Sequence, residues 1–423
     1  MTTPTRLLRI AAIGAVDDGK STLVGRVLHS LGGIPDDELR AISTAGNHRD
    51  SGPMDLALAT DGLRSERERG ITIDVAYRYG VTPSHRLIIA DCPGHFEYTR
   101  NMATGASTAD VALVVVDVTI GLREQTLRHL CLAVLFGVSK VVVAVNKMDL
   151  VAFSEVRFSE LSAEIEERAS TIEGLELEIV PVSALDGDNV MEPSSRTPWY
   201  LGGALMPALE SAAKSRQGGG RLSASRLPVQ WVQERPGGNR TFAGMLSGAQ
   251  LTVGQAVRLL PSLDEDRVGY LETPQGVSES AGVSISVAVG LVSRRRLQRG
   301  DMIADLVHPP RLTSQLEVTL CWFATTRLKA GGRYLLKHTT RMVAAEVAAV
   351  LGVLDVQSLR LEAASGLDEN QIGRVSLSVE SWLAVDDYLD NHQTGSLVLI
   401  DPQSGTTVAA GLIGPPQRGW VAG

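Results

Sequence analysis

Aromatic side chains and cysteines are scarce in this 423-residue sequence. Phe, Trp and Tyr make up 4% of the residues, which argues against an extended platform for stacking nucleic-acid bases. The three cysteines, Cys92, Cys131 and Cys321, lie far apart and lack the spacing of metal ligands. We therefore do not expect a secreted fold held together by disulfides. We expect a reducing, cytoplasmic location.

The sequence also lacks an excess of basic residues and a long apolar run. Its 40 Lys and Arg face 48 Asp and Glu, a net charge of −8, which argues against a nucleic-acid partner. No uninterrupted apolar stretch is long enough to span a bilayer, so no membrane association is expected. The apolar start runs directly into a glycine-rich loop, which argues against a removable signal peptide. The length predicts two or three domains.

Residues 1–215 alternate β-branched runs with stretches of helical period. The pattern predicts a doubly wound, mostly parallel α/β sheet. The expected strands are 7–15, 85–92, 110–118, 140–149 and 177–184, and the expected helices are 21–31, 99–107, 124–137 and 154–170. Residues 32–70 interrupt this rhythm and are long and polar, as mobile functional loops often are.

The character of the chain changes after residue 215. Residues 216–225 are rich in Gly and Ser and predict a flexible linker. Short alternating runs with Gly-rich turns follow, which predict two β-barrel domains over 226–306 and 311–423. The stretch HPPRLTSQ is expected to be the joint between them.

Residues 14–21, GAVDDGKS, fit the phosphate-loop pattern G-x-x-x-x-G-K-[ST] between an expected strand and an expected helix. Glycines let such a loop turn its N–H groups toward phosphate at a helix N-terminus. Lys20 is expected to reach the β- and γ-phosphates, and the Ser21 hydroxyl to ligate Mg²⁺. The predicted phosphate-binding residues are Gly14, Ala15, Val16, Asp17, Asp18, Gly19, Lys20, Ser21 and Thr22.

A second motif, Asp91-Cys92-Pro93-Gly94-His95, follows the next expected strand of the parallel sheet. Asp91 is expected to contact Mg²⁺ through water, and the Gly94 N–H to reach the γ-phosphate. Cys92 has no apparent base or metal partner and is expected to be a small packing residue. Upstream, Thr72 in the polar loop is expected to complete Mg²⁺ coordination when the γ-phosphate is present.

Two further strand ends carry the predicted base pocket. The Asp149 carboxylate can accept hydrogen bonds from guanine N1–H and N2–H₂, which adenine cannot supply. Ser183-Ala184 is placed to offer a backbone N–H to guanine O6. The full predicted set is Asn146, Lys147, Asp149, Ser183, Ala184 and Leu185, and it predicts GTP as the ligand.

VDDGKST, ERERGITID, DCPGH, NKMD and SAL together resemble the translation-factor class of GTPases, in which two β-barrels follow the GTPase domain. Within that class, TDGLRSERERGITIDVAYRY, PGHFEYTRNMATGASTADVALVVVDVTIGLREQTLRH and ENQIGRVSLSVE resemble the large, GTPase subunit of sulfate adenylyltransferase, or ATP sulfurylase (CysN type). The resemblance covers nearly the whole chain and is thin between 235 and 305.

That resemblance implies a heterodimer with a small, CysD-type catalytic subunit that converts ATP and sulfate into adenylyl sulfate and pyrophosphate. GTP hydrolysis on the present chain would drive this uphill step. The resemblance also implies that His95 orients the attacking water, with Lys20 and Thr72 as further catalytic residues. The chain ends soon after TVAAGLIGPPQRGWVAG, so a fused adenylyl-sulfate kinase domain is not expected.

Two departures from the family and two alternatives stay open. The turn GMLSG is shorter than usual, and Arg294, Arg295 and Arg296 form either a solvated turn or an altered partner surface.

One alternative is an elongation factor that delivers aminoacyl-tRNA, which GTP-dependent tRNA binding would reveal. The other is a regulatory switch without a partner enzyme, which a co-purifying adenylyl-transferring subunit would exclude.

Overall fold

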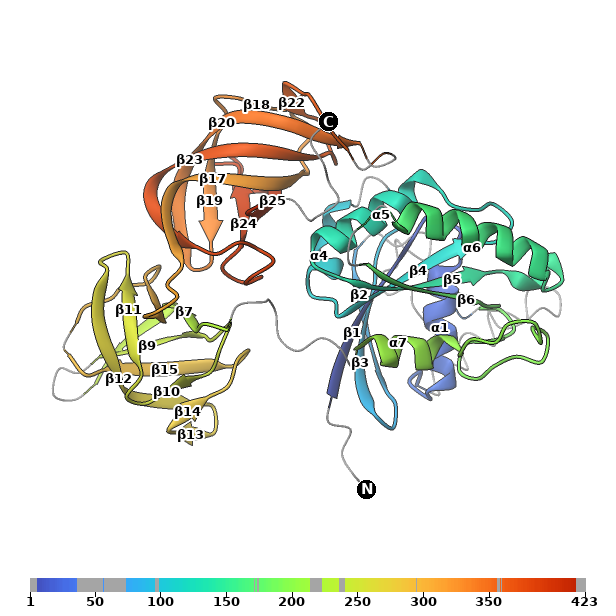
Figure 1. Ribbon diagram of the computed structural model, residues 1–423, viewed down its shortest axis with the longest axis horizontal. Coiled ribbons are helices and arrows are strands. Elements are labelled where there is room, and N and C mark those ends of the chain that lie inside the picture. Colours follow the sequence, from blue (N-terminus) through green and yellow to red (C-terminus); the bar gives the residue numbers. More distant parts are fainter. Residues whose placement is uncertain are drawn as a thin grey trace. The chain divides into compact units, whose positions relative to one another are not determined.

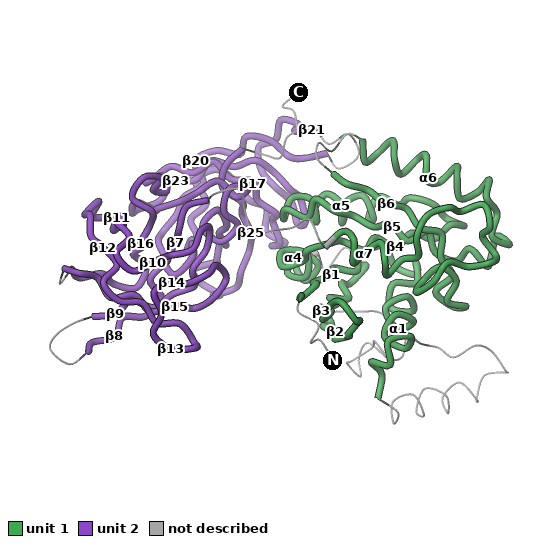
Figure 2. Tube along the Cα trace, turned by 60° about the horizontal axis from the view of Figure 1, so that its bottom comes forward, with its two compact units in different colours: residues 1–216, 356–359, 417–421 green, residues 217–355, 360–416, 422–423 purple. Residues whose placement is uncertain are grey.

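The computed structural model describes residues 6–35, 56, 74–95, 99–170, 172, 175–213, 223–235, 240–293, 295–355, 358 and 360–415. They group into two compact units, one built mainly from residues 1–216 and the other mainly from 217–416 (Figure 2). The first unit is an α/β layer structure, and the second is built from antiparallel strands.

A six-stranded sheet forms the centre of the first unit, in the order β2-β3-β1-β4-β5-β6. All neighbouring pairs are parallel except β2–β3, which places an antiparallel strand at one edge. The strands are β1 (Arg6–Gly14), β2 (Ala76–Val81), β3 (His85–Asp91), β4 (Val111–Asp117), β5 (Lys140–Asn146) and β6 (Glu176–Pro181). The helices are α1 (Lys20–Ser30), α4 (Thr99–Ser107), α5 (Glu124–Leu135), η3 (Met148–Val151), α6 (Glu155–Ser170) and α7 (Leu205–Ala213).

The central strands are apolar because helices cover both faces of the sheet. Every residue of β4, VALVVVD, is buried, as expected for a strand covered on both faces. Figure 1 shows α5 and α6 on one side of the sheet and α1 and α7 on the other. Leu23 of α1 and Leu205 of α7 belong to one buried cluster with Leu113 of β4. The carboxyl ends of the parallel strands therefore meet at one edge, which is where polar motifs can converge.

The second unit begins with an antiparallel sheet in the order β7-β16-β11-β12-β15-β9-β8, with β13 beside β12. Backbone hydrogen bonds between Arg226 and Ser247 bring β7 beside the chain that follows β9. The strands are β7 (Arg226–Pro228), β8 (Trp231–Glu234), β9 (Arg240–Met245), β11 (Ala256–Leu260), β12 (Asp264–Thr273), β13 (Gly276–Val277), β15 (Ser286–Leu291) and β16 (Met302–Asp305), with β10 (Leu251–Thr252) paired to β14 (Ser280–Ala281).

A second antiparallel sheet, in the order β19-β24-β25-β17-β23-β20-β21, closes into a barrel because β19 also pairs with β20. Its interior is filled by apolar side chains such as Leu316, Val375 and Leu399. The strands are β17 (Arg311–Trp322), β19 (Arg333–His338), β20 (Arg341–Asp355), β21 (Arg360–Glu362), β23 (Ile372–Val385), β24 (Ser396–Ile400) and β25 (Thr407–Ile413), and β18 (Leu328–Lys329) pairs with β22 (Gly366–Leu367).

The predicted fold class, a doubly wound GTPase-type sheet followed by β-barrels, is confirmed. The boundaries at 215, 226, 306 and 311 stay predictions, since the described residues group into two units rather than three. The predicted joint HPPRLTSQ is shorter than expected, because β17 already begins at Arg311 and pairs there with Val385. In the described part of the chain, no helix has the length and apolarity needed to cross a membrane.

Candidate nucleotide-binding site

The predicted phosphate loop connects Gly14, the last residue of β1, to Lys20, the first residue of α1. Gly14 and Gly19 have φ of +152° and +88°, which side chains rarely allow. A Cβ on Gly14 would lie 2.5 Å from the Val115 carbonyl oxygen, and one on Gly19 would lie 2.4 Å from Asn146 Nδ2. The loop is thus pressed against the ends of β4 and β5, and only glycine fits at these two points.

Lys20 is buried within the loop, and its Nζ donates to the Ala15 carbonyl oxygen at 3.0 Å. Burial lowers the pKa of Lys20, while the carboxylates of Asp91 and Asp18 oppose this shift. A Cβ on Gly94 would lie only 2.7 Å from Lys20 Nζ, so the DCPGH loop lies directly against the lysine. No side chain caps the N-terminus of α1. A desolvated ammonium beside an uncapped helix N-terminus fits a phosphate group.

Ser21 and Asp91 meet at the predicted magnesium position. The Ser21 hydroxyl donates to Asp91 Oδ2 at 3.1 Å, although 70 residues separate the two in sequence. Among the described residues, no group of three or more His, Cys, Asp or Glu side chains could hold a metal. One hydroxyl and one carboxylate suit Mg²⁺, which commonly takes its other ligands from water and substrate phosphates. Thr72, the third predicted ligand, lies outside the described residues.

Asn146 and Lys147 tie the predicted base pocket to the phosphate loop. Asn146 Nδ2 donates to the Asp18 carbonyl oxygen at 2.9 Å. Lys147 Nζ donates to the Asp17 carbonyl oxygen at 2.6 Å and lies 2.7 Å from Asp117 Oδ2. Burial alone would raise the pKa of Asp117, but hydrogen bonds from Lys147 and Thr119 outweigh it and lower the pKa. Asp117 is therefore held as a carboxylate that fixes the lysine.

The remaining base residues lie together at the ends of β5 and β6. The Ser183 hydroxyl donates to Asp149 Oδ1 at 2.7 Å, which orients the carboxylate. The Ala184 N–H donates to Asn146 Oδ1 at 3.0 Å. Contact of this N–H with a guanine O6 therefore requires that the Asn146 hydrogen bond be exchanged. The Leu185 side chain is exposed.

Cys92, Pro93 and Gly94 are buried at the end of β3, and His95 is half-buried directly after them. Burial raises the pKa of the Cys92 thiol, and its Sγ contacts the Ala90 carbonyl oxygen. A thiol kept protonated in this way is a poor nucleophile and agrees with a packing role. The role of His95 in orienting the attacking water stays a prediction.

Four residues that belong to no short sequence motif also support this site. Arg26 Nε donates to the Ala184 carbonyl oxygen at 3.0 Å, and its guanidinium also contacts the Leu185 carbonyl oxygen. The others are Arg123, Asp117 and His129. Asp117 ends β4, and its position at a strand end was the one sequence signal available.

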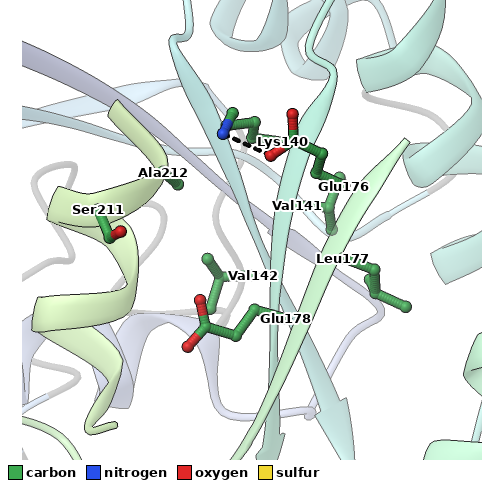
Figure 3. Close-up of a pocket in the computed structure, with 8 residues that line it drawn as sticks. All are labelled: Lys140, Val141, Val142, Glu176, Leu177, Glu178, Ser211 and Ala212. Carbon is green, nitrogen blue, oxygen red and sulfur yellow. Dashed lines mark hydrogen bonds and ion pairs between the residues drawn. The ribbon is translucent and has the colours of Figure 1, made fainter. Parts of the chain in front are cut away.

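A separate hollow in the first unit lies away from this site. It is lined by Lys140, Glu176 and Glu178 of β5 and β6 and by Ser211 of α7 (Figure 3). Lys140 and Glu176 begin their strands, so the hollow lies at the amino ends of the parallel strands. The nucleotide residues follow the carboxyl ends, where ligands bind in sheets of this kind. The hollow is therefore not part of the candidate site.

Two family profiles match the chain. The Elongation factor Tu GTP binding domain matches residues 5–229. The GTP-eEF1A C-terminal domain-like family matches residues 315–414. The first match covers more than half of the chain and contains every residue of the candidate site.

Curated relatives match almost the full length. A bifunctional enzyme CysN/CysC of Mycobacterium tuberculosis is 42% identical over 97% of this chain and 67% of its own length. Sulfate adenylyltransferase subunit 1 of Laribacter hongkongensis is 42% identical over 96% of this chain and 85% of its own. Among solved structures, a bacterial selenocysteine-specific elongation factor aligns with 97% of this chain and 59% of its own, at 21% identity and a TM-score of 0.47. The chain therefore belongs to the family of sulfate adenylyltransferase subunit 1, within the GTPases that carry an elongation factor Tu GTP-binding domain.

Proposed function

We propose that this chain hydrolyses GTP to drive the conversion of ATP and sulfate into adenylyl sulfate and pyrophosphate on a separate catalytic subunit. The supporting observation is the set of side-chain to backbone contacts that join the base and phosphate loops. Asn146 donates to the Asp18 carbonyl oxygen and Lys147 donates to the Asp17 carbonyl oxygen, so one connected surface would face both ends of a nucleotide.

The phosphate end of this surface matches the requirements of phosphoryl transfer. Lys20 would supply a buried cation for the β- and γ-phosphates, and Gly94, which lies against Lys20, would offer its N–H to the γ-phosphate. Ser21 and Asp91 would hold Mg²⁺, with Thr72 added from the polar loop. When bound, Mg²⁺ neutralises the charge that develops on the phosphate oxygens. His95, from the same loop as Gly94, would orient the attacking water.

The base end of this surface would select guanine. Asp149 would accept from guanine N1–H and N2–H₂, and the Ser183 hydroxyl holds that carboxylate in place. A half-buried acceptor that adenine leaves unpaired would disfavour ATP by a large factor, on the order of 10⁴-fold. Selectivity of this kind lets the chain hydrolyse GTP while its partner uses ATP.

The family name, subunit 1, and the uphill chemistry of adenylyl sulfate formation support a partner. The relatives are named as a subunit of sulfate adenylyltransferase, and formation of adenylyl sulfate needs an external free-energy source. The partner would be the small catalytic subunit, in a heterodimer. The elongation-factor alternative shares the GTPase domain and the C-terminal domain family but is not better supported, because the curated relatives are named as sulfate adenylyltransferase subunits. A cytoplasmic location and the absence of a fused adenylyl-sulfate kinase stay predictions.

A pyrophosphate-release assay with ATP and sulfate tests the proposal. With the purified partner present, we expect GTP to raise the yield of adenylyl sulfate well beyond the equilibrium level reached without GTP. The control is Asp149→Asn, in which xanthosine triphosphate should replace GTP as the driving nucleotide, because the amide donates where the carboxylate accepted. An adenylyl sulfate yield that GTP leaves unchanged would overturn the coupling.

A further inference from the structure

The phosphate loop carries a buried carboxylate in a position where negative charge opposes phosphate binding. The Asp18 side chain is fully buried, and its Oδ2 accepts the Ala15 N–H at 3.0 Å. Burial raises the pKa of Asp18, and the guanidinium of Arg123 opposes that shift. An unbalanced anion at this point would repel the phosphates of a nucleotide in a medium of low dielectric constant.

Arg123 reaches the loop from the residue directly before α5. Its Nη1 donates to the Val16 carbonyl oxygen at 2.8 Å, and its Nη2 lies 3.8 Å from Asp18 Oδ1. The side chain is 31% exposed, so its charge is partly desolvated. One guanidinium thus holds the main chain of the loop and lies beside its acidic side chain. This use of both ends of the planar group is one that lysine cannot reproduce.

The other charged groups near Asp18 already have partners of their own. Lys20 donates to the Ala15 carbonyl oxygen and is shared with Asp91. Asp117, which also faces Asp18, is paired with Lys147 at 2.7 Å. Among the described residues, Arg123 therefore supplies the cation that balances Asp18 without drawing on the groups assigned to phosphate.

We propose that Arg123 is a positioning residue of the nucleotide site, which fixes the phosphate loop through Val16 and balances the charge of Asp18 so that a guanosine di- or triphosphate can bind. This inference rests on the proposed GTP-binding function. Because the guanidinium binds the loop rather than the reacting atoms, its removal should weaken nucleotide binding and leave turnover at saturating GTP nearly unchanged.

Release and equilibrium binding of a fluorescent GDP analogue test the proposal on the full chain. Arg123→Ala should weaken GDP binding by about 10- to 100-fold, the range expected for loss of a charged hydrogen bond. The turnover number at saturating GTP should stay within about twofold. Arg123→Lys, which keeps the charge, should recover part of the affinity. Arg128→Ala is the matched control, because Arg128 lies on α5, the helix that begins directly after Arg123, and pairs with Glu124.

A second background isolates the charge effect. In Asp18→Asn the carboxylate is gone, so Arg123→Ala should cost at least about fivefold less in GDP affinity there than in the wild-type chain. Thermal unfolding without nucleotide shows whether each variant folds. If Arg123→Ala does not fold, the GDP affinities of Arg123→Lys and Asp18→Asn are compared with that of the wild-type chain instead. Unchanged GDP affinity in Arg123→Ala, or a loss of turnover alone, would overturn the proposal. A wild-type chain that binds no GDP would instead overturn the GTP site itself.

Discussion

The Ser183 hydroxyl donates a hydrogen bond of 2.7 Å to Oδ1 of Asp149, across 34 residues of sequence. This contact fixes the orientation of the carboxylate that we assign to the guanine base. Asp149→Asn should weaken GDP binding by at least about 100-fold, because the amide replaces one of the two charged acceptor oxygens with an NH₂ donor that opposes a guanine N–H. The same variant should bind xanthosine diphosphate more tightly than GDP. Competition between the two nucleotides measures this switch.

Ser183→Ala is the matched control for the base pocket. It keeps the Asp149 carboxylate but removes its orienting donor, so its loss of GDP affinity should be smaller, about 5- to 10-fold. Unchanged preference for guanine in Asp149→Asn would remove Asp149 from the base pocket.

Gly94→Ala should damage the phosphate end without touching the base end. The new Cβ would lie 2.7 Å from Lys20 Nζ and 3.0 Å from both the Ala15 carbonyl carbon and the Val16 nitrogen. The lysine or the loop must therefore move. We expect the affinity for a non-hydrolysable GTP analogue to fall by about 10-fold or more while preference for guanine over adenine is kept. Wild-type affinity for the analogue would contradict the close approach.

The buried His129 side chain should make stability depend on pH. Burial and the nearby charge of Lys20 lower the pKa of His129 to about 3. Between pH 3 and the unfolded value near 6.5, the unfolded chain binds a proton that the folded chain does not, so stability falls as the pH falls through this window. From pH 7 to pH 5.5 this contribution is about 1.3 kcal/mol.

Urea unfolding of His129→Asn at these two pH values measures the effect. The variant should lose about 1.3 kcal/mol less than the wild-type chain over this interval. His308→Asn is the control, because the His308 side chain is 72% exposed. Equal losses in the wild-type chain and in His129→Asn would contradict a neutral, buried His129.

A buried ion pair should stabilise the second unit. Arg226 Nε and Nη2 each lie 2.9 Å from one oxygen of Asp386, and the two side chains are 1% and 8% exposed. Asp386→Ala leaves a buried guanidinium without its carboxylate and should lower the free energy of unfolding by about 3–5 kcal/mol.

The exposed pair of Arg327 and Asp368, also at 2.9 Å, is the control for this prediction. Asp368→Ala should cost no more than about 1 kcal/mol, since solvent screens an exposed pair. Similar losses in the two variants would show that burial does not set the strength of these pairs.

The sequence predicted the parts of this fold that depend on local pattern. All five strands expected in the first half were found, because continuous apolar runs such as VALVVVD suit a covered parallel sheet. The edge strand β2 was not expected, since AYRYGV has a mixed exposure pattern and no such run. Helix α7, LMPALESAA, was also not expected, because it is short. Its Met206 and Leu209 side chains belong to the buried cluster beside the sheet.

The residues of the candidate site also fall into those that a short motif predicts and those that it does not. Motif residues such as Lys20, Asp91 and Asp149 were predicted because a short spacing pattern identifies them. Arg123 was not, because its contact with Val16 joins residues 107 positions apart and exists only once β1 and β4 are neighbours. The spacing of a motif does not record which distant side chain will support it.

Calorimetric titration of the full chain with GDP in the presence of Mg²⁺ measures whether the assigned pocket binds a guanine nucleotide. We expect one GDP bound per chain and no measurable heat from ADP at the same concentration. The wild-type chain should bind GDP more tightly than xanthosine diphosphate, and Asp149→Asn should bind xanthosine diphosphate more tightly than GDP. This reversal would show that the heat comes from binding at the assigned pocket. No heat with GDP, or equal binding of GDP and ADP, would show that the chain has no guanine-selective nucleotide site.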